Sequence, residues 1–92
     1  MALAVATITI MPISPDTDLD ALEVKVKEVI KGFAGEKETK TEIEPVAFGL
    51  KALKVLFVME ESLGSPDPIA DKVSEFEEVN SAEITDVRRA IG

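Results

Sequence analysis

The chain has 92 residues, of which 46% are hydrophobic and 30% charged, and this composition predicts one globular domain spanning residues 1–92. It contains no Cys, His, Tyr or Trp; this excludes disulfides, removes the usual zinc ligands and general base, and argues against an enzyme or a cofactor site. The net charge of −8 opposes direct nucleic-acid binding and favours a basic surface on a partner.

Residues 3–11 form the first predicted strand, which is rich in Ala, Val, Ile and Thr. Ile8 and Ile10 fall on one side, and Thr7 and Thr9 on the other, so one face is expected to be covered and the other partly open. No positively charged segment precedes this strand, and no apolar run approaches the length of a membrane span. We therefore expect no signal peptide, no membrane contact and a cytoplasmic location.

An amphipathic helix follows Pro12 and Pro15 and is expected to end at Gly32 or Gly35. Asp16 to Asp18 supply its N-cap and first-turn residues. The apolar positions recur at steps of three and four: Leu19, Leu22, Val26, Val29, Ile30 and Phe33.

The alternate acids Asp16, Asp18 and Asp20 also match the opening of a calcium-binding EF-hand loop. The remainder of that loop is missing, because Ala21 stands where Gly is needed and Lys27 stands where a bidentate Glu is needed. Acids favoured at a helix start are the better interpretation, and no metal site is predicted.

Residues 37–44 alternate charged and hydroxyl side chains around a single Ile43, a pattern typical of a solvated edge strand. Residues 50–59 are apolar at nearly every position, which predicts a central strand. Between them, Phe48 lies at a Gly-flanked corner. Its ring either enters the core or anchors a partner, and the pattern alone leaves both open; Phe33, Phe57 and Phe76 already lie on core periods.

Residues 60–64 connect this strand to a second, shorter helix, with Ser65 as N-cap and Pro66 in the first helical position. The core face of this segment is marked by Ile69, Val73 and Phe76. Residues 79–87 alternate again and predict the last strand. A tail begins with Arg88 and Arg89.

The predicted order is strand, helix, strand, strand, helix, strand, which in about 90 residues gives an α+β ferredoxin-like βαββαβ sandwich. Two helices would cover one face of a four-stranded antiparallel sheet, with the first and third strands central. The other face would stay partly open, with Thr7, Thr9 and Lys54 on it.

Arg88 and Arg89 are the only arginines. They either charge a strand terminus or contact phosphate or carboxylate on a partner, for which the guanidinium fork is suited. The acids Glu60, Glu61, Glu75, Glu77 and Glu78 are expected to be solvated, and the glycines match no nucleotide-binding loop.

Residues 45–51, Pro-Val-Ala-Phe-Gly-Leu-Lys, resemble the Pro-Ile-Gly-Phe-Gly-Ile-Lys signature of the translation elongation factor 1-beta exchange domain family. The likeness covers the whole chain: residues 5–12 resemble the family's first strand, residues 19–30 its first helix, and residues 85–87 its Thr-Asp-Ile or Asp-Val segment. The length resembles the short archaeal form.

The resemblance implies a guanine nucleotide exchange factor that promotes GDP release and GTP exchange on elongation factor 1-alpha, without enzymatic turnover or cofactor. Its partner would be GDP-bound or nucleotide-free elongation factor 1-alpha, and the free protein is expected to be a monomer. In the family, the aromatic at position 48 docks on the partner's second domain, and the C-terminal residues reach the Mg²⁺ and phosphate region of its G domain. The implied contact residues are Pro45, Val46, Phe48, Gly49, Lys51, Arg88, Arg89 and Ile91.

The family's near-terminal Lys falls opposite Gly92, which leaves open whether Arg88 or Arg89 supplies that charge. One alternative is a small ferredoxin-like module with a regulatory or ligand-binding role. Another is an acylphosphatase-like enzyme, which needs an Arg cradle after the first strand and a positioning Asn. No Arg precedes Arg88, and the only Asn is Asn80.

Overall fold

The computed structural model describes residues 2–35 and 38–90. The element order is strand, helix, strand, strand, helix, strand, and it confirms the predicted ferredoxin-like α+β fold. Short 3₁₀ turns flank the third strand. The elements are β1 Leu3–Pro12, α1 Leu19–Ala34, β2 Thr39–Pro45, η1 Ala47–Gly49, β3 Lys51–Glu60, η2 Glu61–Leu63, α2 Asp67–Val73 and β4 Val79–Ala90.

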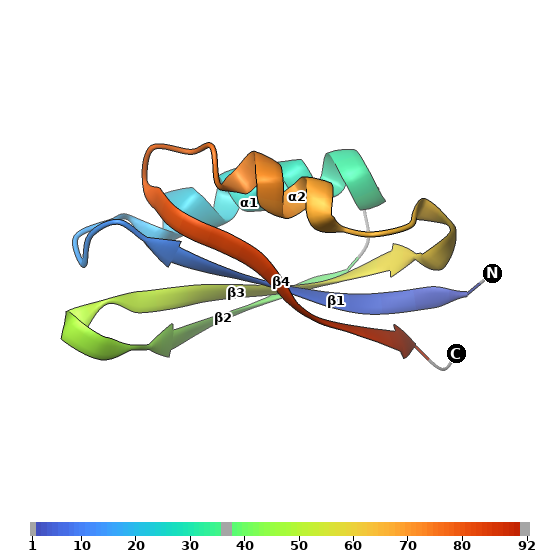
Figure 1. The fold of residues 1–92 in the computed structure, drawn as a ribbon, viewed down its shortest axis with the longest axis horizontal. Helices are drawn as coiled ribbons and strands as arrows, with labels where there is room; N and C mark the ends of the chain where they lie inside the picture. Colours follow the sequence, from blue (N-terminus) through green and yellow to red (C-terminus); the bar gives the residue numbers. More distant parts are fainter. Residues whose placement is uncertain (1, 36–37, 91–92) are drawn as a thin grey trace.

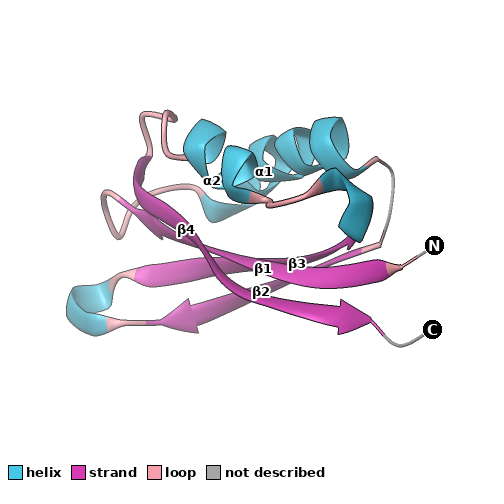
Figure 2. Cartoon of the chain, turned by 45° about the vertical axis from the view of Figure 1, so that its right-hand side comes forward, coloured by secondary structure: helices cyan, strands magenta, loops and turns pink. Residues whose placement is uncertain are grey.

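The four strands form one antiparallel sheet in the order β2-β3-β1-β4. Both helices lie on the same face of this sheet, and no helix of the described residues covers the other face (Figures 1 and 2). The apolar strands β1 and β3 are central and the more polar β2 and β4 are edges, as predicted. A central strand is paired on both sides, and its side chains therefore pack against more neighbours than those of an edge strand.

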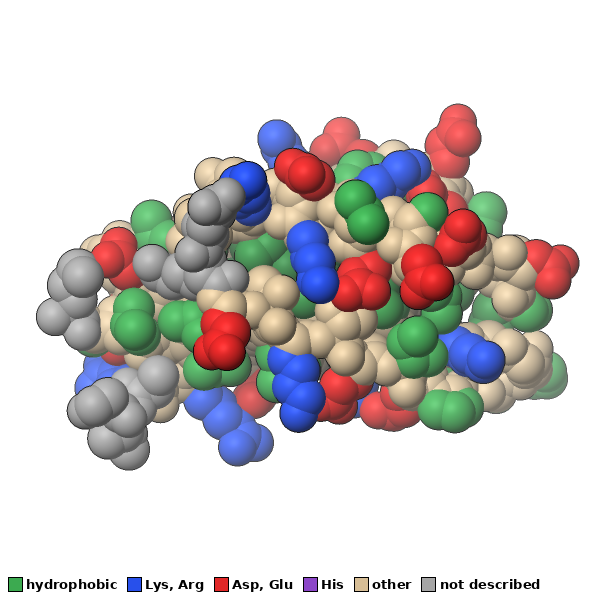
Figure 3. Space-filling view, turned by 180° about the vertical axis from the view of Figure 1, so that it is seen from behind, with side chains coloured by type: hydrophobic (Ala, Val, Ile, Leu, Met, Phe, Trp, Pro, Cys, Tyr) green, Lys and Arg blue, Asp and Glu red, His purple; other side chains and the backbone are tan. Residues whose placement is uncertain are grey.

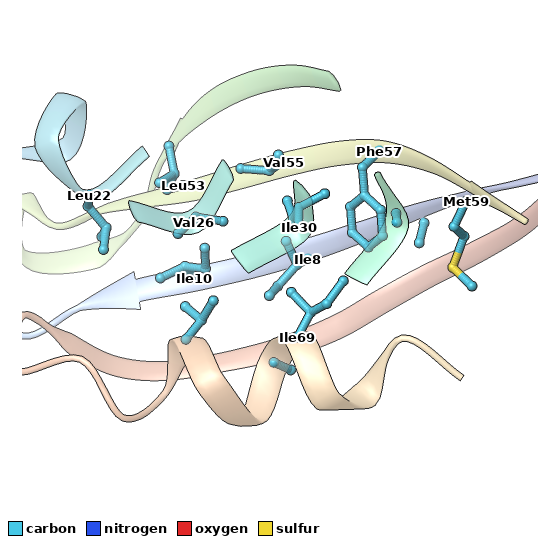
Figure 4. Close-up of a cluster of buried hydrophobic side chains, with 14 of the residues drawn as sticks. Ile8, Ile10, Leu22, Val26, Ile30, Leu53, Val55, Phe57, Met59 and Ile69 are labelled. Atoms are coloured by element: carbon cyan, nitrogen blue, oxygen red, sulfur yellow. The ribbon is translucent and has the colours of Figure 1, made fainter. Parts of the chain in front are cut away.

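The core lies between the helices and the sheet (Figure 4). Every second residue of β1 is buried from Ala4 onwards, and the same alternation in β3 buries Phe57, which is 1% exposed. Each large apolar side chain removed from water in this way contributes about 1.5 to 3 kcal/mol. The helices supply Leu22, Val26, Ile30, Ala34, Ile69, Ala70 and Val73 to the core.

Helix α1 begins and ends where its sequence predicts. The Asp18 side chain accepts a hydrogen bond from the Ala21 amide at 3.1 Å, which satisfies a backbone donor of the first turn. Gly35 adopts a φ of 82°, and its amide donates to the Lys31 carbonyl at 2.9 Å. A positive φ favours glycine at this position.

Helix α2 begins one residue later than predicted. Its first helical residue is Asp67, and Pro66 occupies the N-cap, so the expected places of Ser65 and Pro66 were wrong. The Ser65 hydroxyl still accepts from the Asp67 amide at 3.2 Å, which turns the chain before the helix starts. Phe76 lies beyond the helix end and packs, partly buried, against the core.

Strand β4 extends to Ala90, three residues beyond the predicted end. Arg88 and Arg89 therefore belong to a strand, whereas the sequence placed them in a tail. The physical reason is that β1 starts at Leu3 and offers pairing partners as far as the Leu3–Ala90 rung. A register shift between Thr7 and Ile8 marks a bulge in β4 at Thr85.

The uncovered face carries Thr7, Thr9 and Lys54, all partly exposed, as the alternation predicted. The hydroxyls of Thr9 and Thr85 lie 2.9 Å apart on it, at the bulge. In the described part of the chain, no helix is long and apolar enough to cross a membrane.

Candidate functional site

The connection between β2 and β3 presents Phe48 to solvent. The Val46 amide donates to the Leu50 carbonyl at 2.9 Å, and the Leu50 amide donates to the Ala47 carbonyl at 3.2 Å, so the turn is closed from both sides. Within it, Phe48 has a φ of 61° and Gly49 a φ of 76°. The Phe48 side chain is 94% exposed. The ring therefore does not enter the core, which was one of the two interpretations. Docking on a partner, the other interpretation, stays a prediction.

This conformation is unfavourable for the isolated protein. Among the described residues, Phe48 is the one non-glycine residue with a positive φ, which costs an L-residue roughly 1 to 2 kcal/mol. An exposed ring also forgoes the gain from burial. Strained and exposed apolar residues concentrate at binding sites, where a partner uses the geometry.

Other exposed apolar side chains occur in the same segment, which we call the Phe48 corner (residues 43–51). Val46 is 37% exposed and Ile43 is 51% exposed. Ile43 was absent from the predicted site, although its position as the single apolar residue in a polar strand was a usable signal. Pro45, Gly49 and Lys51 are also exposed, so the predicted residues of this segment lie together.

A salt bridge borders the Phe48 corner on the uncovered sheet face. Lys54 Nζ lies 2.6 Å from Glu44 Oε2, across the β2–β3 ladder. The hydrogen bond to Glu44 raises the pKa of Lys54. This pair holds two charges beside the corner in a defined place, and exposed pairs of this kind contribute little to stability.

The two arginines point to opposite faces of the sheet, because neighbouring residues in a strand alternate. Arg88 is opposite Val5, on the uncovered face, and its Nε donates to Asp86 Oδ2 at 2.8 Å. The Arg88 side chain is 81% exposed. Ile91, another predicted contact residue, lies outside the described residues.

Arg89 is opposite Ala4, on the helix side of the sheet, and forms a bidentate pair with Glu61. Its Nε donates to Glu61 Oε2 at 3.0 Å, and a terminal guanidinium nitrogen donates to Oε1 at 3.0 Å. Glu61 raises the pKa of Arg89 by accepting these hydrogen bonds. The prediction that Glu61 is only a solvated acid therefore missed this contact.

The Phe48 corner and the arginines lie at opposite ends of the sheet (Figure 1). Strand β3 begins at Lys51, the last residue of the corner, and ends at Glu60, which is in register with Leu3 and, through it, with Ala90. Its 10 residues span about 30 Å at roughly 3.3 Å each. Those predicted contact residues that the structure describes therefore form two separate regions.

The remaining acids are dispersed or have structural partners. Asp18 caps α1 and Asp20 lies in its first turn, as the helix-start interpretation predicted. Lys25 donates to Glu78 at 2.7 Å and lowers the pKa of that carboxyl. Within residues 2–35 and 38–90, no group of three acids is placed to hold a metal ion. Figure 3 shows acidic and basic side chains interspersed over the face that it presents.

A hollow of about 520 Å³ lies between the two helices. Its apolar wall comes mainly from Val29 and Phe33 of α1 and from Pro68 and Ile69 of α2, with Glu28, Asp71 and Lys72 also lining it. This hollow is on the helical side of the molecule, and its lining shares no residue with either contact region.

Comparisons with known proteins agree with the sequence signature. A family model described as the EF-1 guanine nucleotide exchange domain matches residues 5–90. Elongation factor 1-beta of Methanothermobacter thermautotrophicus is 43% identical over 89 residues, which cover 97% of this chain and 98% of that protein. The protein of the same name from Pyrococcus horikoshii is 45% identical over 86 residues, covering 92% of each chain. That of Nanoarchaeum equitans is 46% identical over 81 residues, with 88% and 98% covered.

Among solved structures, a chain titled BlrP1 BLUF is similar in fold, with a TM-score of 0.57. The superposition covers 98% of this chain and 56% of that one, at 15% sequence identity. At this identity the likeness shows the fold alone, and ferredoxin-like folds host many unrelated functions.

Proposed function

This chain belongs to the EF-1 guanine nucleotide exchange domain family, and we infer that it acts as a nucleotide exchange factor in translation elongation. Its partner is the GTP-binding elongation factor 1-alpha, in its GDP-bound and nucleotide-free states. An exchange factor needs no nucleophile or general base of its own, which suits a chain without His or Cys. It acts by binding the nucleotide-free partner more tightly than the nucleotide-bound one. By linkage, GDP then weakens binding of the exchange factor by the same factor.

The exposed ring of Phe48 is the observation that carries the proposal for how the partner is held. A rigid aromatic side chain loses little conformational entropy on binding and buries a large apolar area. The turn already holds it away from the sheet, so the partner need not reorganise it. Phe48 is the anchor, and Val46 and Ile43 of the same segment are also exposed.

The second contact region lies about 30 Å away, at the arginine end of the sheet. A partner held at the Phe48 corner meets this end at a high effective concentration, because the rigid sheet fixes the distance between the two regions. We expect contacts there to act near the phosphate and Mg²⁺ region of the partner, as the family resemblance implies for the C-terminal residues. Disturbing that region weakens nucleotide binding, since phosphate contacts hold much of the nucleotide.

The free protein is a cytoplasmic monomer in this proposal. Strand β2 is an exposed edge, but Lys40, Glu42 and Glu44 line it with charge, which opposes pairing with a second copy. Sedimentation of the purified chain at micromolar concentration tests this statement. A dimer would contradict it.

Release of a fluorescent GDP analogue from purified elongation factor 1-alpha tests the proposed function. We expect acceleration by the wild-type chain, and we expect Phe48→Ala to raise the concentration for half-maximal acceleration about 30-fold, the equivalent of a hot spot of about 2 kcal/mol. Val24→Ala is the matched control, because Val24 is a 62% exposed apolar residue on α1. A folded wild-type chain that does not accelerate release would refute the function. Equal effects of the two variants would refute the anchor.

A further inference from the structure

Glu61 connects three strands at the arginine end of the sheet. It directly follows the last residue of β3, and its amide donates to the Ala2 carbonyl, just before β1, at 3.0 Å. Its carboxylate accepts two hydrogen bonds from Arg89 of β4. Three chain segments far apart in sequence are thus joined at one residue.

The Arg89 side chain reaches Glu61 by crossing β1. The rung that contains Arg89 continues through Ala4 to Met59, so β1 lies between the two ion-pair partners. Ala4 is small, which leaves room for the arginine to pass above it. A hollow of about 350 Å³ remains there, lined by Ala4, Met59, Glu61, Gly64, Val87 and Arg89.

Among the described residues, this end of β4 is held by its ladder with β1, and the side chains of residues 85–89 are exposed. It is an edge strand paired with β1 alone, and Val87, two residues before Arg89, is 51% exposed on the helix side. Strand ends with little burial open easily. A bidentate ion pair across the sheet opposes that opening, and its planar geometry fixes the direction of the strand.

Arg88 differs from Arg89 in each of these respects. It lies on the uncovered face, and its partner Asp86 belongs to the same strand, so this pair ties β4 to nothing else. The two adjacent arginines are therefore suited to different roles. Both side chains are mostly exposed, at 74% for Arg89 and 81% for Arg88, but Arg89 is paired across the sheet and Arg88 only within its own strand.

We propose that Arg89 is a positioning residue that clamps the end of β4 to Glu61, so that Arg88 is presented in a fixed place to an anionic group of the partner. The proposal rests on the exchange function inferred above and assigns the cationic role to Arg88. Glu61 and Arg89 form the clamp. Arg88 binds the anionic group.

A charge swap across the clamp tests this assignment through GDP release. We expect Arg89→Glu to slow exchange about fivefold, the scale on which an exposed bidentate pair shifts an opening equilibrium. The double variant Glu61→Arg with Arg89→Glu restores the pair in reverse and is expected to recover exchange to within about twofold. A double variant as slow as Arg89→Glu alone would show that Arg89 itself touches the partner and would overturn the proposal.

The same swap at the outward pair is the matched control. Arg88→Glu is expected to slow exchange about tenfold or more, because a carboxylate at this position repels the anionic group that the guanidinium attracts. Adding Asp86→Arg restores a local pair but places the positive charge elsewhere, so exchange stays slow. Recovery by this second swap would contradict direct binding by Arg88.

Amide hydrogen exchange of residues 87–90 provides a readout that does not depend on the partner. Arg89→Glu is expected to speed exchange of these amides about fivefold, and the clamp swap is expected to restore their protection. Arg88→Glu leaves them unchanged. Unaltered protection in Arg89→Glu would overturn the clamp. The wild-type protein could fail to accelerate GDP release from elongation factor 1-alpha while the clamp swap restores amide protection of residues 87–90. That result would refute the proposed function and leave the clamp supported.

Discussion

The two ends of the sheet differ in whether their side chains already have partners within the free protein. At the Phe48 corner a large ring is 94% exposed in a left-handed turn. At the opposite end, Arg89 and Glu61 satisfy each other through two hydrogen bonds of 3.0 Å. The first arrangement gains from a partner, because the ring is still in contact with water, whereas the second already has its charges paired.

This difference teaches how to separate contact residues from supporting residues in a small binding domain. Phe48 and Arg89 both stand out in the sequence, one as a corner aromatic and the other as a rare arginine. The structure leaves the first without a packing partner and gives the second an internal one. Exposure together with strain is therefore the better guide to the anchor.

The largest effect is expected from the second aromatic of the β2–β3 hairpin. Phe57 is 1% exposed and packs in the core, so Phe57→Ala is expected to reduce the free energy of unfolding by about 3 to 5 kcal/mol. Phe48→Ala is expected to change it by less than about 0.5 kcal/mol, as at an exposed site. Urea denaturation of the two variants measures both values. A reduction above about 2 kcal/mol in Phe48→Ala would show that the ring supports the fold.

A smaller effect is expected at the glycine that follows the ring. Gly49 has a φ of 76°, so Gly49→Ala strains the turn and is expected to cost about 1 to 2 kcal/mol. Gly32 lies in α1, with nothing within 4 Å of an added Cβ, and Gly32→Ala is expected to stabilise by about 0.5 to 1 kcal/mol. Thermal unfolding compares the two. The same sign for both would contradict the conformational argument at the corner.

A third prediction concerns the effect of acidic pH on the stability of the protein, through a salt bridge away from both ends of the sheet. The pKa of Glu78 is lowered from its ordinary value of 4.5 by the hydrogen bond from Lys25. The ionised form is therefore favoured by folding, and this stability is present above pH 4.5 and lost as pH falls through the lower folded value. The pair is partly exposed, so the contribution is expected to be below about 1 kcal/mol. Glu78→Gln should reduce stability at about pH 7 and leave it unchanged at about pH 2.

The smallest effect is expected from salt, which separates an electrostatic region from an apolar one. Raising ionic strength screens the exposed Arg88 and has little effect on burial of the Phe48 ring. Half-maximal exchange by wild type is expected to need about twofold more protein at about 0.5 M than at about 0.1 M salt. Arg88→Gln is expected to lose part of this dependence, and Phe48→Ala is expected to keep it. If Phe48→Ala lost the salt dependence and Arg88→Gln kept it, the assignment of the electrostatic contact to the arginine end would be wrong.

The elements and their order could be read from the sequence because they follow from local periodicity. Ile8 and Ile10 recur at steps of two, and Leu22, Val26 and Ile30 recur at steps of four, and all are buried as expected. The apolar content of residues 50–59 also identified a central strand. The boundaries of α2 and β4 were less well predicted. The start of α2 is a local choice between the adjacent residues Ser65 and Pro66, whereas the end of β4 depends on the pairing partners that β1 offers.

The sequence by itself determined the ferredoxin-like order, the central and edge strands and the family signature at residues 45–51. Only the tertiary structure decided that Phe48 faces solvent, since a corner ring packs inward or outward according to what lies beside it. It also decided that Arg88 and Arg89 face opposite ways and that Arg89 meets Glu61, 28 residues away in sequence. The physical reason is that β1 extends far enough to keep β4 in register to Ala90, and strand pairing of this kind depends on distant segments.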